Sequence, residues 1–290
     1  MLFQVRFPRY NASAFKLVLV LSRWKRSLGH EPLPPMPYES AEAIPEEGDV
    51  YWIAVKPPTT IVSYPNSHIV IVDVWEQVPS GKNIKVIRLN SKLRNLKYVE
   101  AAKQLGFPTH YLRELVSLYD DTLPLGEFLT LTKTVELVDF YLKIGSVPEI
   151  GIEYVKNYIR SVVEEKSPLA ESAYRRARKA LAGKIFVIEV DSFYAYVREK
   201  ALREAVKKGA DTVLVIRTED SVTHIFFRSV DKQRARALAT KLAKQLGNCS
   251  LKGKTSIRPV LQFTKRVSLE EVLSAISAIE SKSRGETTCP

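Results

Sequence analysis

Residues 68–75 read His68-Ile69-Val70-Ile71-Val72-Asp73-Val74-Trp75, and this stretch decides the fold class. Its four consecutive β-branched residues, 69–72, predict a strand of a parallel sheet that is covered on both faces. The strand delivers a carboxylate, Asp73, to its carboxyl end, where functional side chains gather in such sheets. The chemistry open to Asp73 therefore depends on which side chains follow the neighbouring strands.

Apolar patterns on both sides of this stretch predict an α/β chain with two domains. In the first, strands are expected at 2–7, 49–55, 69–72 and 84–89, a helix at 12–27, and several helices between 95 and 166. Ser167-Pro168 offers an N-cap and a first-turn proline for a linker helix that runs through Leu181 and ends at Gly183. In the second domain, strands are expected at 184–190, 212–217 and 223–227, and helices at 195–208, 230–246 and 269–279. The predicted organisation is therefore a parallel-sheet domain at 1–166, a linker helix at 167–183 and a smaller α/β domain at 184–290.

The positive charge of the chain lies in its second part. Of the 290 residues, which carry a net charge of +12, residues 1–171 hold 20 Lys and Arg and 20 Asp and Glu, whereas residues 172–290 hold 24 and 12. A basic domain beside a neutral one suggests a polyanion such as nucleic acid as its partner, because each phosphate that is neutralised releases counterions. The competing explanation is that scattered lysines keep the surface soluble.

Composition argues against several other classes of protein. The longest apolar runs are far shorter than the roughly 20 residues of a membrane-spanning helix. Together with the lack of a signal-peptide pattern, they favour a cytoplasmic protein. Two cysteines, Cys249 and Cys289, rule out a disulfide framework and are too few for a zinc site without histidine. The four histidines show no ligand-like spacing, so no cofactor is expected.

The strand with its terminal Asp73 resembles the DHH phosphoesterases, the superfamily of RecJ nuclease. In that family a similar apolar strand ends in Asp-His-His, and these side chains bind catalytic manganese. Val74 and Trp75 stand here where the two histidines would be. The resemblance implies the DHH fold, and it also implies a site that this chain does not complete.

The other family ligands are also missing or reduced. The resemblance places the first ligand turn at residues 8–13 and the second at residues 53–58, and neither segment contains an acid. It places a fourth family aspartate at Asp120 or Asp121, shortly before an apolar-Pro-apolar turn. Two carboxylates without a histidine supply too few ligands for two metal ions. We therefore expect Asp73 to cap the following turn instead.

The resemblance extends into the basic domain. In the domain that accompanies DHH proteins, a strand ends in Arg-Ser, a helix follows, and a glycine-rich loop then contacts the nucleotide backbone. This chain keeps Arg228-Ser229 after a strand, and residues 247–254 keep two glycines and add two lysines while losing the loop histidine. Such a loop can hold phosphates through lysines and backbone amides, although an ordinary basic turn explains it equally well.

Loss of metal ligands on an intact scaffold is the pattern of a protein that moved from catalysis to binding. Among inactive RecJ relatives, the chain resembles the compact archaeal counterparts of the replication-fork factor cell division control protein 45. That resemblance implies association with the GINS complex and the MCM helicase, a nucleoid-associated location, and binding of single-stranded DNA. The residues expected at DNA are Arg228, Ser229, Lys252, Lys254 and Arg258, with Arg234, Arg236, Arg175, Arg176 and Arg178 as further candidates.

Two other functions remain open at this point. A manganese-dependent RecJ-like exonuclease or small phosphodiesterase would need an unusual ligand set that includes Asp73 and Asp120 or Asp121. An interaction protein without a nucleic-acid role would use its basic half to dock an acidic partner.

Overall fold

The computed structural model describes residues 1–8, 10–34, 44–74, 77–89, 96–120, 122–146, 151–229, 231–252 and 259–285. The chain forms two compact units, Met1–Glu164 and Glu165–Pro290. None of the helices in these described ranges combines the length and the apolar character that a membrane crossing requires.

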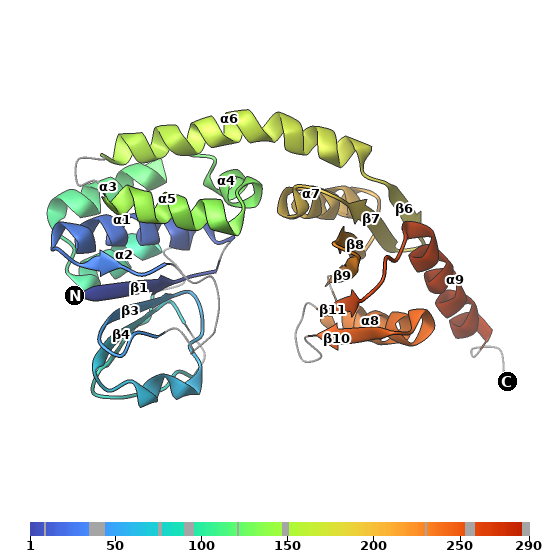
Figure 1. The fold of residues 1–290 in the computed structure, drawn as a ribbon, viewed down its shortest axis with the longest axis horizontal. Helices are drawn as coiled ribbons and strands as arrows, with labels where there is room; N and C mark the ends of the chain where they lie inside the picture. Colours follow the sequence, from blue (N-terminus) through green and yellow to red (C-terminus); the bar gives the residue numbers. More distant parts are fainter. Residues whose placement is uncertain are drawn as a thin grey trace. The chain divides into compact units, whose positions relative to one another are not determined.

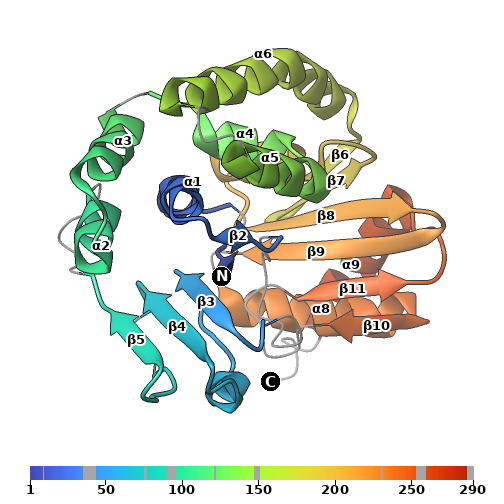
Figure 2. The ribbon, with the colours of Figure 1, turned by 60° about the vertical axis from the view of Figure 1, so that its left-hand side comes forward.

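A five-stranded sheet, parallel throughout, forms the centre of the first unit (Figures 1 and 2). Its order is β2-β1-β3-β4-β5, so the chain reverses its direction of travel across the sheet between β1 and β3. In open parallel sheets, ligand sites lie at the carboxyl ends of the strands beside such a reversal. The strands are β1 (Leu2–Arg6), β2 (Glu31–Pro32), β3 (Gly48–Ile53), β4 (Ser67–Val72) and β5 (Ile84–Ile87).

Helix α1 (Ala12–Ser27) is the central helix of this unit. Asn11 caps it by accepting a hydrogen bond from the Ala14 N–H to its Oδ1 at 3.0 Å, and Lys25 and Arg26 lie in its last turn, where cations stabilise the helix dipole. It contacts four later helices (Figure 1). These are α2 (Lys97–Leu105), α3 (Thr109–Asp120), α4 (Leu125–Leu131) and α5 (Thr134–Ser146).

The opposite face of the sheet is covered by shorter segments. Trp52 is fully buried there together with Ile69 and Ile71, and Ile61 of the 3-10 helix η2 (Thr59–Ser63) packs against them. Both faces of β3 and β4 are therefore buried, as the continuous apolar run at 69–72 predicted.

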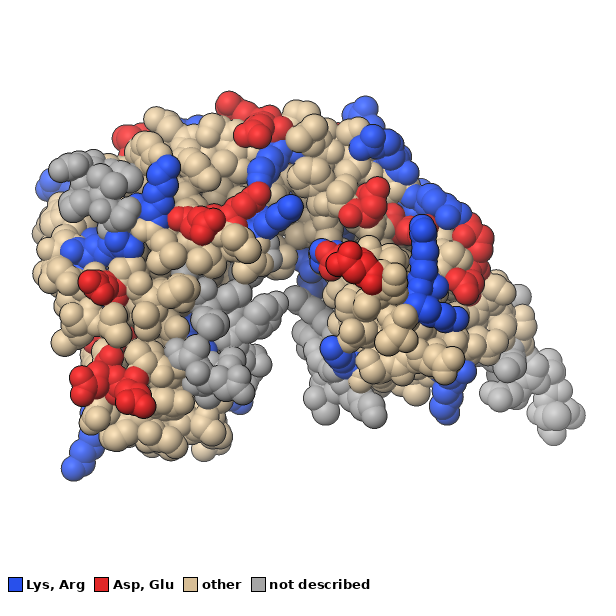
Figure 3. Space-filling view, viewed as in Figure 1, with Lys and Arg blue, Asp and Glu red and all other residues tan. Residues whose placement is uncertain are grey.

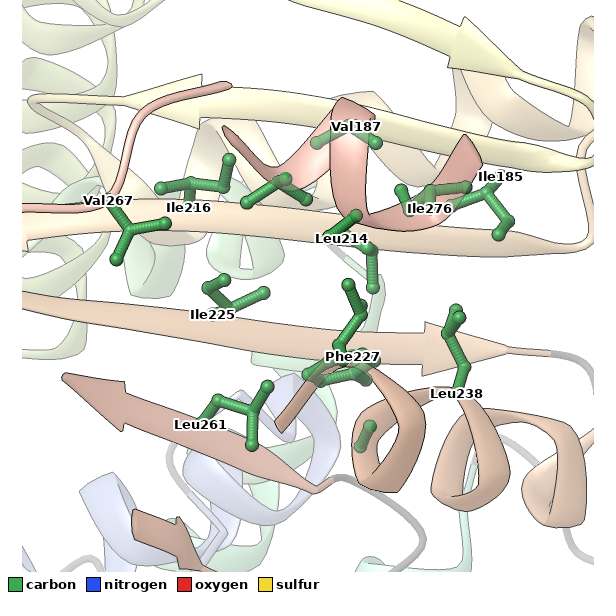
Figure 4. Close-up of a cluster of buried hydrophobic side chains, with 14 of the residues drawn as sticks. Ile185, Val187, Leu214, Ile216, Ile225, Phe227, Leu238, Leu261, Val267 and Ile276 are labelled. Atoms are coloured by element: carbon green, nitrogen blue, oxygen red, sulfur yellow. The ribbon is translucent and has the colours of Figure 1, made fainter. Parts of the chain in front are cut away.

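The second unit has a six-stranded mixed sheet of order β10-β11-β9-β8-β7-β6, in which β7 and β8 pair in parallel and the other neighbours pair antiparallel. Helix α7 packs on one face, and α8 and α9 enclose a large apolar core on the other (Figure 4). The strands are β6 (Lys179–Ala182), β7 (Ile185–Val190), β8 (Thr212–Glu219), β9 (Val222–Ser229), β10 (Cys249–Lys252) and β11 (Val260–Phe263). The helices are α7 (Tyr194–Lys207), α8 (Lys232–Leu246) and α9 (Leu269–Gly285).

The predicted linker helix is wrong at both ends. Helix α6 (Ile152–Arg176) already includes Ser167 and Pro168 in its interior, and the residues expected at the end of the linker form β6 instead. Pro168 cannot donate the hydrogen bond that would reach the carbonyl of Glu164, so α6 lacks one internal bond at the place where the two units divide. Strands β2, β10 and β11 were also not predicted, whereas the remaining predicted helices and strands of both domains are present.

Candidate functional site

Asp73 lies directly after β4, at the carboxyl edge of the parallel sheet. Its N–H continues the ladder to the Ile87 carbonyl at 3.0 Å, and its φ of 60° turns the chain sharply away from the sheet. Ala54 does the same after β3, with its N–H on the Val72 carbonyl at 2.8 Å and a φ of 55°. Two adjacent strands therefore end in the left-handed conformation, which non-glycine residues adopt only at a cost of about 1–2 kcal/mol.

The first turn of α2 binds the carboxylate of Asp73. The Lys97 ammonium lies 2.6 Å from Asp73 Oδ2, and the Tyr98 hydroxyl donates to the same oxygen at 2.8 Å. The Asp73 side chain is only 7% exposed and that of Lys97 is 28% exposed. Hydrogen bonds between ionised groups are short and strong in such a setting, because little water competes for them. Asp73 is thus held by a positive charge that the protein itself provides.

Two tyrosines complete the surroundings of Asp73. Burial, and then the hydrogen bond to the Asp73 carboxylate, raise the pKa of Tyr98. Burial and the negative charge of Asp73 also raise the pKa of Tyr119, whose hydroxyl donates to the Ser13 carbonyl at 3.2 Å. Both phenols therefore remain neutral hydrogen-bond donors at ordinary pH.

These side chains do not fit a divalent metal ion. A catalytic manganese site needs several carboxylates or histidines that converge on one point. In the described ranges no three His, Cys, Asp or Glu residues are grouped so that they could hold a metal. The described hydrogen bonds to the Asp73 carboxylate come from α2. Residues 75 and 76 of the following turn lie outside the described residues, so the expected capping role stays a prediction. A metal ion at Asp73 would also meet the like charge of Lys97.

Three of the expected remnants of the family site lie wholly or partly outside the described residues. Trp75 and Asp121 lie outside the described residues. Asp120 is the last residue of α3, and only its backbone is described. Their expected places beside Asp73 remain predictions.

A second polar cluster, which the sequence did not predict, surrounds Asp49 near the amino end of β3. Lys25 Nζ lies 2.5 Å from Asp49 Oδ2, the Tyr51 hydroxyl donates to the same oxygen at 3.3 Å, and His68 Nδ1 lies 3.3 Å from Oδ1. Burial works against the charged form of Asp49, but the bond and charge of Lys25 outweigh it and lower the pKa of the carboxyl. Burial, and next the charge of Lys25, lower the pKa of His30, whose Nδ1 is 3.8 Å from Asp49. This cluster ties α1 to the sheet.

In the second unit, the hydroxyl of Ser229 makes three hydrogen bonds within the fold. It donates to the Asp211 carbonyl at 3.1 Å and accepts from the Thr212 hydroxyl at 3.0 Å and from the Asp231 N–H at 3.2 Å. These bonds join the end of β9 to the start of β8 and of α8. The expected DNA contact through Ser229 would therefore have to compete with three internal hydrogen bonds.

The expected basic residues fall into different environments. Arg228 is partly exposed in β9, and Lys252 is exposed at the end of β10. Arg234 pairs with Asp211. Arg236 is partly exposed on α8. Lys254 and Arg258 lie outside the described residues.

The arginines that were expected on a linker helix do not share one helix. Arg175 and Arg176 are exposed in the last turn of α6, and Arg175 pairs with Glu171 at 3.2 Å. Arg178 follows the helix and pairs with Glu189 and Glu270. On the face seen in Figure 3, basic side chains lie in separate groups with acidic ones between them. The charge of the second unit is therefore not one continuous patch on that face.

Comparison with known proteins identifies the fold. Neither the protein-family models nor the curated proteins contain a match to this chain. Among solved structures, exonuclease RecJ bound to manganese matches over 100% of this chain and 91% of its own, with a TM-score of 0.56 and 11% identity. The chain has the fold of exonuclease RecJ.

Two further solved structures share this fold. CDC45 from Entamoeba histolytica has a TM-score of 0.50 and 9% identity, with 95% of each chain covered. RecJ from Thermus thermophilus in complex with Mn2+ has a TM-score of 0.51 and 12% identity, with 100% of this chain and 53% of that chain covered. The predicted fold class is confirmed as an α/β fold like that of RecJ, with a parallel-sheet domain followed by a smaller α/β domain.

Proposed function

We propose that this chain is a non-catalytic RecJ-like DNA replication factor that binds the GINS complex, through it the MCM helicase, and single-stranded DNA. The observation that carries the non-catalytic part is the pair of Asp73 and Lys97. An ammonium 2.6 Å from Asp73 Oδ2 supplies the positive charge that a metal ion would supply in a nuclease. An ammonium cannot activate a water molecule for attack on a phosphodiester as a divalent ion does.

The nucleic-acid part of the proposal rests on charge. The RecJ fold is kept while the excess of Lys and Arg is concentrated after residue 171. Binding through phosphate contacts is sequence-tolerant and weakens as salt rises, because counterions are released on binding.

The partner part rests on the resemblance to inactive RecJ relatives at the replication fork, and the fold shared with CDC45 is consistent with it. GINS is the partner that this resemblance implies directly, and MCM would be reached through GINS.

The test is retention of a labelled single strand by the purified chain, alone and with GINS, at increasing salt. Co-purification with GINS from the native organism is measured in parallel. The proposal expects both, with retention lost as salt rises. It would be overturned if the chain bound neither the strand nor GINS.

A further inference from the structure

The two faces of the second sheet differ in what covers them. On one face, α8 and α9 pack against the side chains of Ile225 and Phe227 in β9 and Leu261 in β11 (Figure 4). On the other face, α7 packs against β7 and β8, the strands in the first part of the sheet. The remaining strands on that side, β9, β11 and β10, keep partly exposed side chains.

The strand register shows which side chains share this second face. In β9, His224, Phe226 and Arg228 alternate with the buried residues of the covered face. Phe226 stands opposite Val260, and Val260 stands opposite Lys252. Cross-strand partners in register lie on the same side of a sheet, so Lys252 shares the face of Phe226. We call the surface of His224, Phe226, Arg228, Val260 and Lys252 the open face.

The rings of Tyr194, Phe226 and His224 form a row that runs from the start of α7 onto the open face. The ring centroid of Phe226 lies 4.7 Å from that of Tyr194, at the start of α7, and 5.9 Å from that of His224. Phe226 and Tyr194 also pack against the apolar core under α7, which holds them in place. The row thus offers ring surface on a rigid support.

Basic groups surround these rings. The guanidinium carbons of Arg217 and Arg198 lie 5.3 Å and 5.5 Å from the Tyr194 ring centroid. Burial, and next the charge of Lys252, lower the pKa of His224, and Arg217 acts in the same direction. Those two charges therefore act on the His224 side chain, while Arg217 pairs with Glu219.

We propose that the open face binds single-stranded nucleic acid, with bases stacked on the row of Phe226 and its neighbours. Phosphates are held by Arg228 and Lys252 of that face and by Arg217, which stands opposite His224 in the neighbouring strand. This inference rests on the proposed function and specifies its surface. Sheet faces with aromatic and basic side chains suit single strands, because every base has a π-face and every linkage a phosphate. A duplex keeps its bases stacked inside and offers only its phosphates. An acidic polypeptide likewise supplies charge without base surfaces.

The experiment compares variants in fluorescence anisotropy with a labelled oligothymidylate of about 20 nucleotides, a length that covers one or more binding sites of this kind. Phe226→Leu removes the ring and keeps apolar volume, and we expect it to weaken binding about tenfold with the salt dependence unchanged. Lys252→Gln should weaken binding and lower the slope of log Kd against log salt by about one phosphate contact. The matched control is Phe227→Leu, because Phe227 is the next residue and points into the covered core. It should leave the Kd unchanged.

Photocrosslinking of the wild-type chain to a 5-iodouridine strand gives a readout that does not depend on variant stability. The crosslinked peptides should contain β9 or the start of α7. Two results would show that the open face is not the binding surface while the proposed function stands. In one, the wild type and Phe226→Leu bind the strand equally tightly; in the other, the crosslinks lie outside β9 and the start of α7. If duplex DNA or polyglutamate displaced the labelled strand as well as an unlabelled single strand does, the proposed stacking of bases would also be overturned. If the wild type binds no single strand at any salt concentration, the DNA-binding part of the proposed function fails.

Discussion

Replacing Lys97 tests whether Asp73 depends on the protein's own cation. Lys97→Met keeps most of the side-chain length and removes the charge, which leaves a carboxylate that is 7% exposed with the Tyr98 hydroxyl as its remaining described partner. Removing one member of a fully buried pair costs about 3–5 kcal/mol. Lys97 is 28% exposed and Tyr98 still donates, so we expect a loss of about 2 kcal/mol in the free energy of unfolding. For a unit of this size, that corresponds to a fall in Tm of roughly 6 °C.

The chain offers a specific probe for this measurement. All three tryptophans, Trp24, Trp52 and Trp75, belong to the first unit, so intrinsic tryptophan fluorescence during urea unfolding reports on that unit. The control is Lys103→Met on the same helix, because Lys103 is 61% exposed and lies 4.0 Å from Glu100. Exposed pairs of this kind contribute about 0–1 kcal/mol. A Lys97→Met variant no less stable than Lys103→Met would show that Asp73 does not depend on the Lys97 ammonium.

A double-mutant cycle separates the pair from other effects of the substitution. Asp73→Asn combined with Lys97→Met removes both charges. We expect the double variant to be more stable than the sum of the two single losses implies, by about 1 kcal/mol or more. Strict additivity would show that the two groups do not interact.

Three other predictions concern pH, helix α6 and the core of the second unit. Burial and Lys25 hold the pKa of His30 low, so its contribution to stability is present above the usual histidine pKa of about 6.5 and is lost as pH falls through the folded-state pKa. His30→Gln should therefore flatten the decline of the urea midpoint between pH 7 and pH 5, measured by tryptophan fluorescence, and a decline as steep as that of the wild type would contradict this role of His30. Pro168→Ala should stabilise α6 by about 1–3 kcal/mol in urea unfolding followed by far-ultraviolet circular dichroism, and an unchanged midpoint would contradict the cost assigned to that proline. Leu214→Ala should cost about 3 kcal/mol by the same method, because Leu214 is fully buried in the core of the second unit; a loss below 1 kcal/mol would contradict that placement.

Local sequence patterns predicted the parts of the fold that depend on local periodicity. The β-branched run at 69–72 forms β4 as expected, and the helix that Asn11 caps begins at Ala12. The Ser167-Pro168 pair led to a wrong prediction of a helix start, because such a pair can begin a helix or lie inside one. Packing elsewhere can offset the cost of an interior proline. Strands β10 and β11 have four residues each, and their pairing partners decide their structure rather than their own sequence.

The candidate sites needed contacts that the sequence does not encode locally. Lys97 meets Asp73 from 24 residues further along the chain. Asp49 and His68 face each other only because β3 and β4 pair in that register. One available signal was missed: the alternation of β9 places Phe226 and Phe227 on opposite faces, and only Phe227 belongs to the closed core.

The proposed function requires that the RecJ fold of this chain carries no nuclease chemistry at Asp73. The most direct measurement is incubation with manganese and a 5′-labelled single strand, followed by separation of the products by length. We expect the label to remain on the full-length strand over the range of protein concentrations that binds it. Shortening of the strand by the wild type, abolished by Asp73→Ala and dependent on manganese, would contradict the claim.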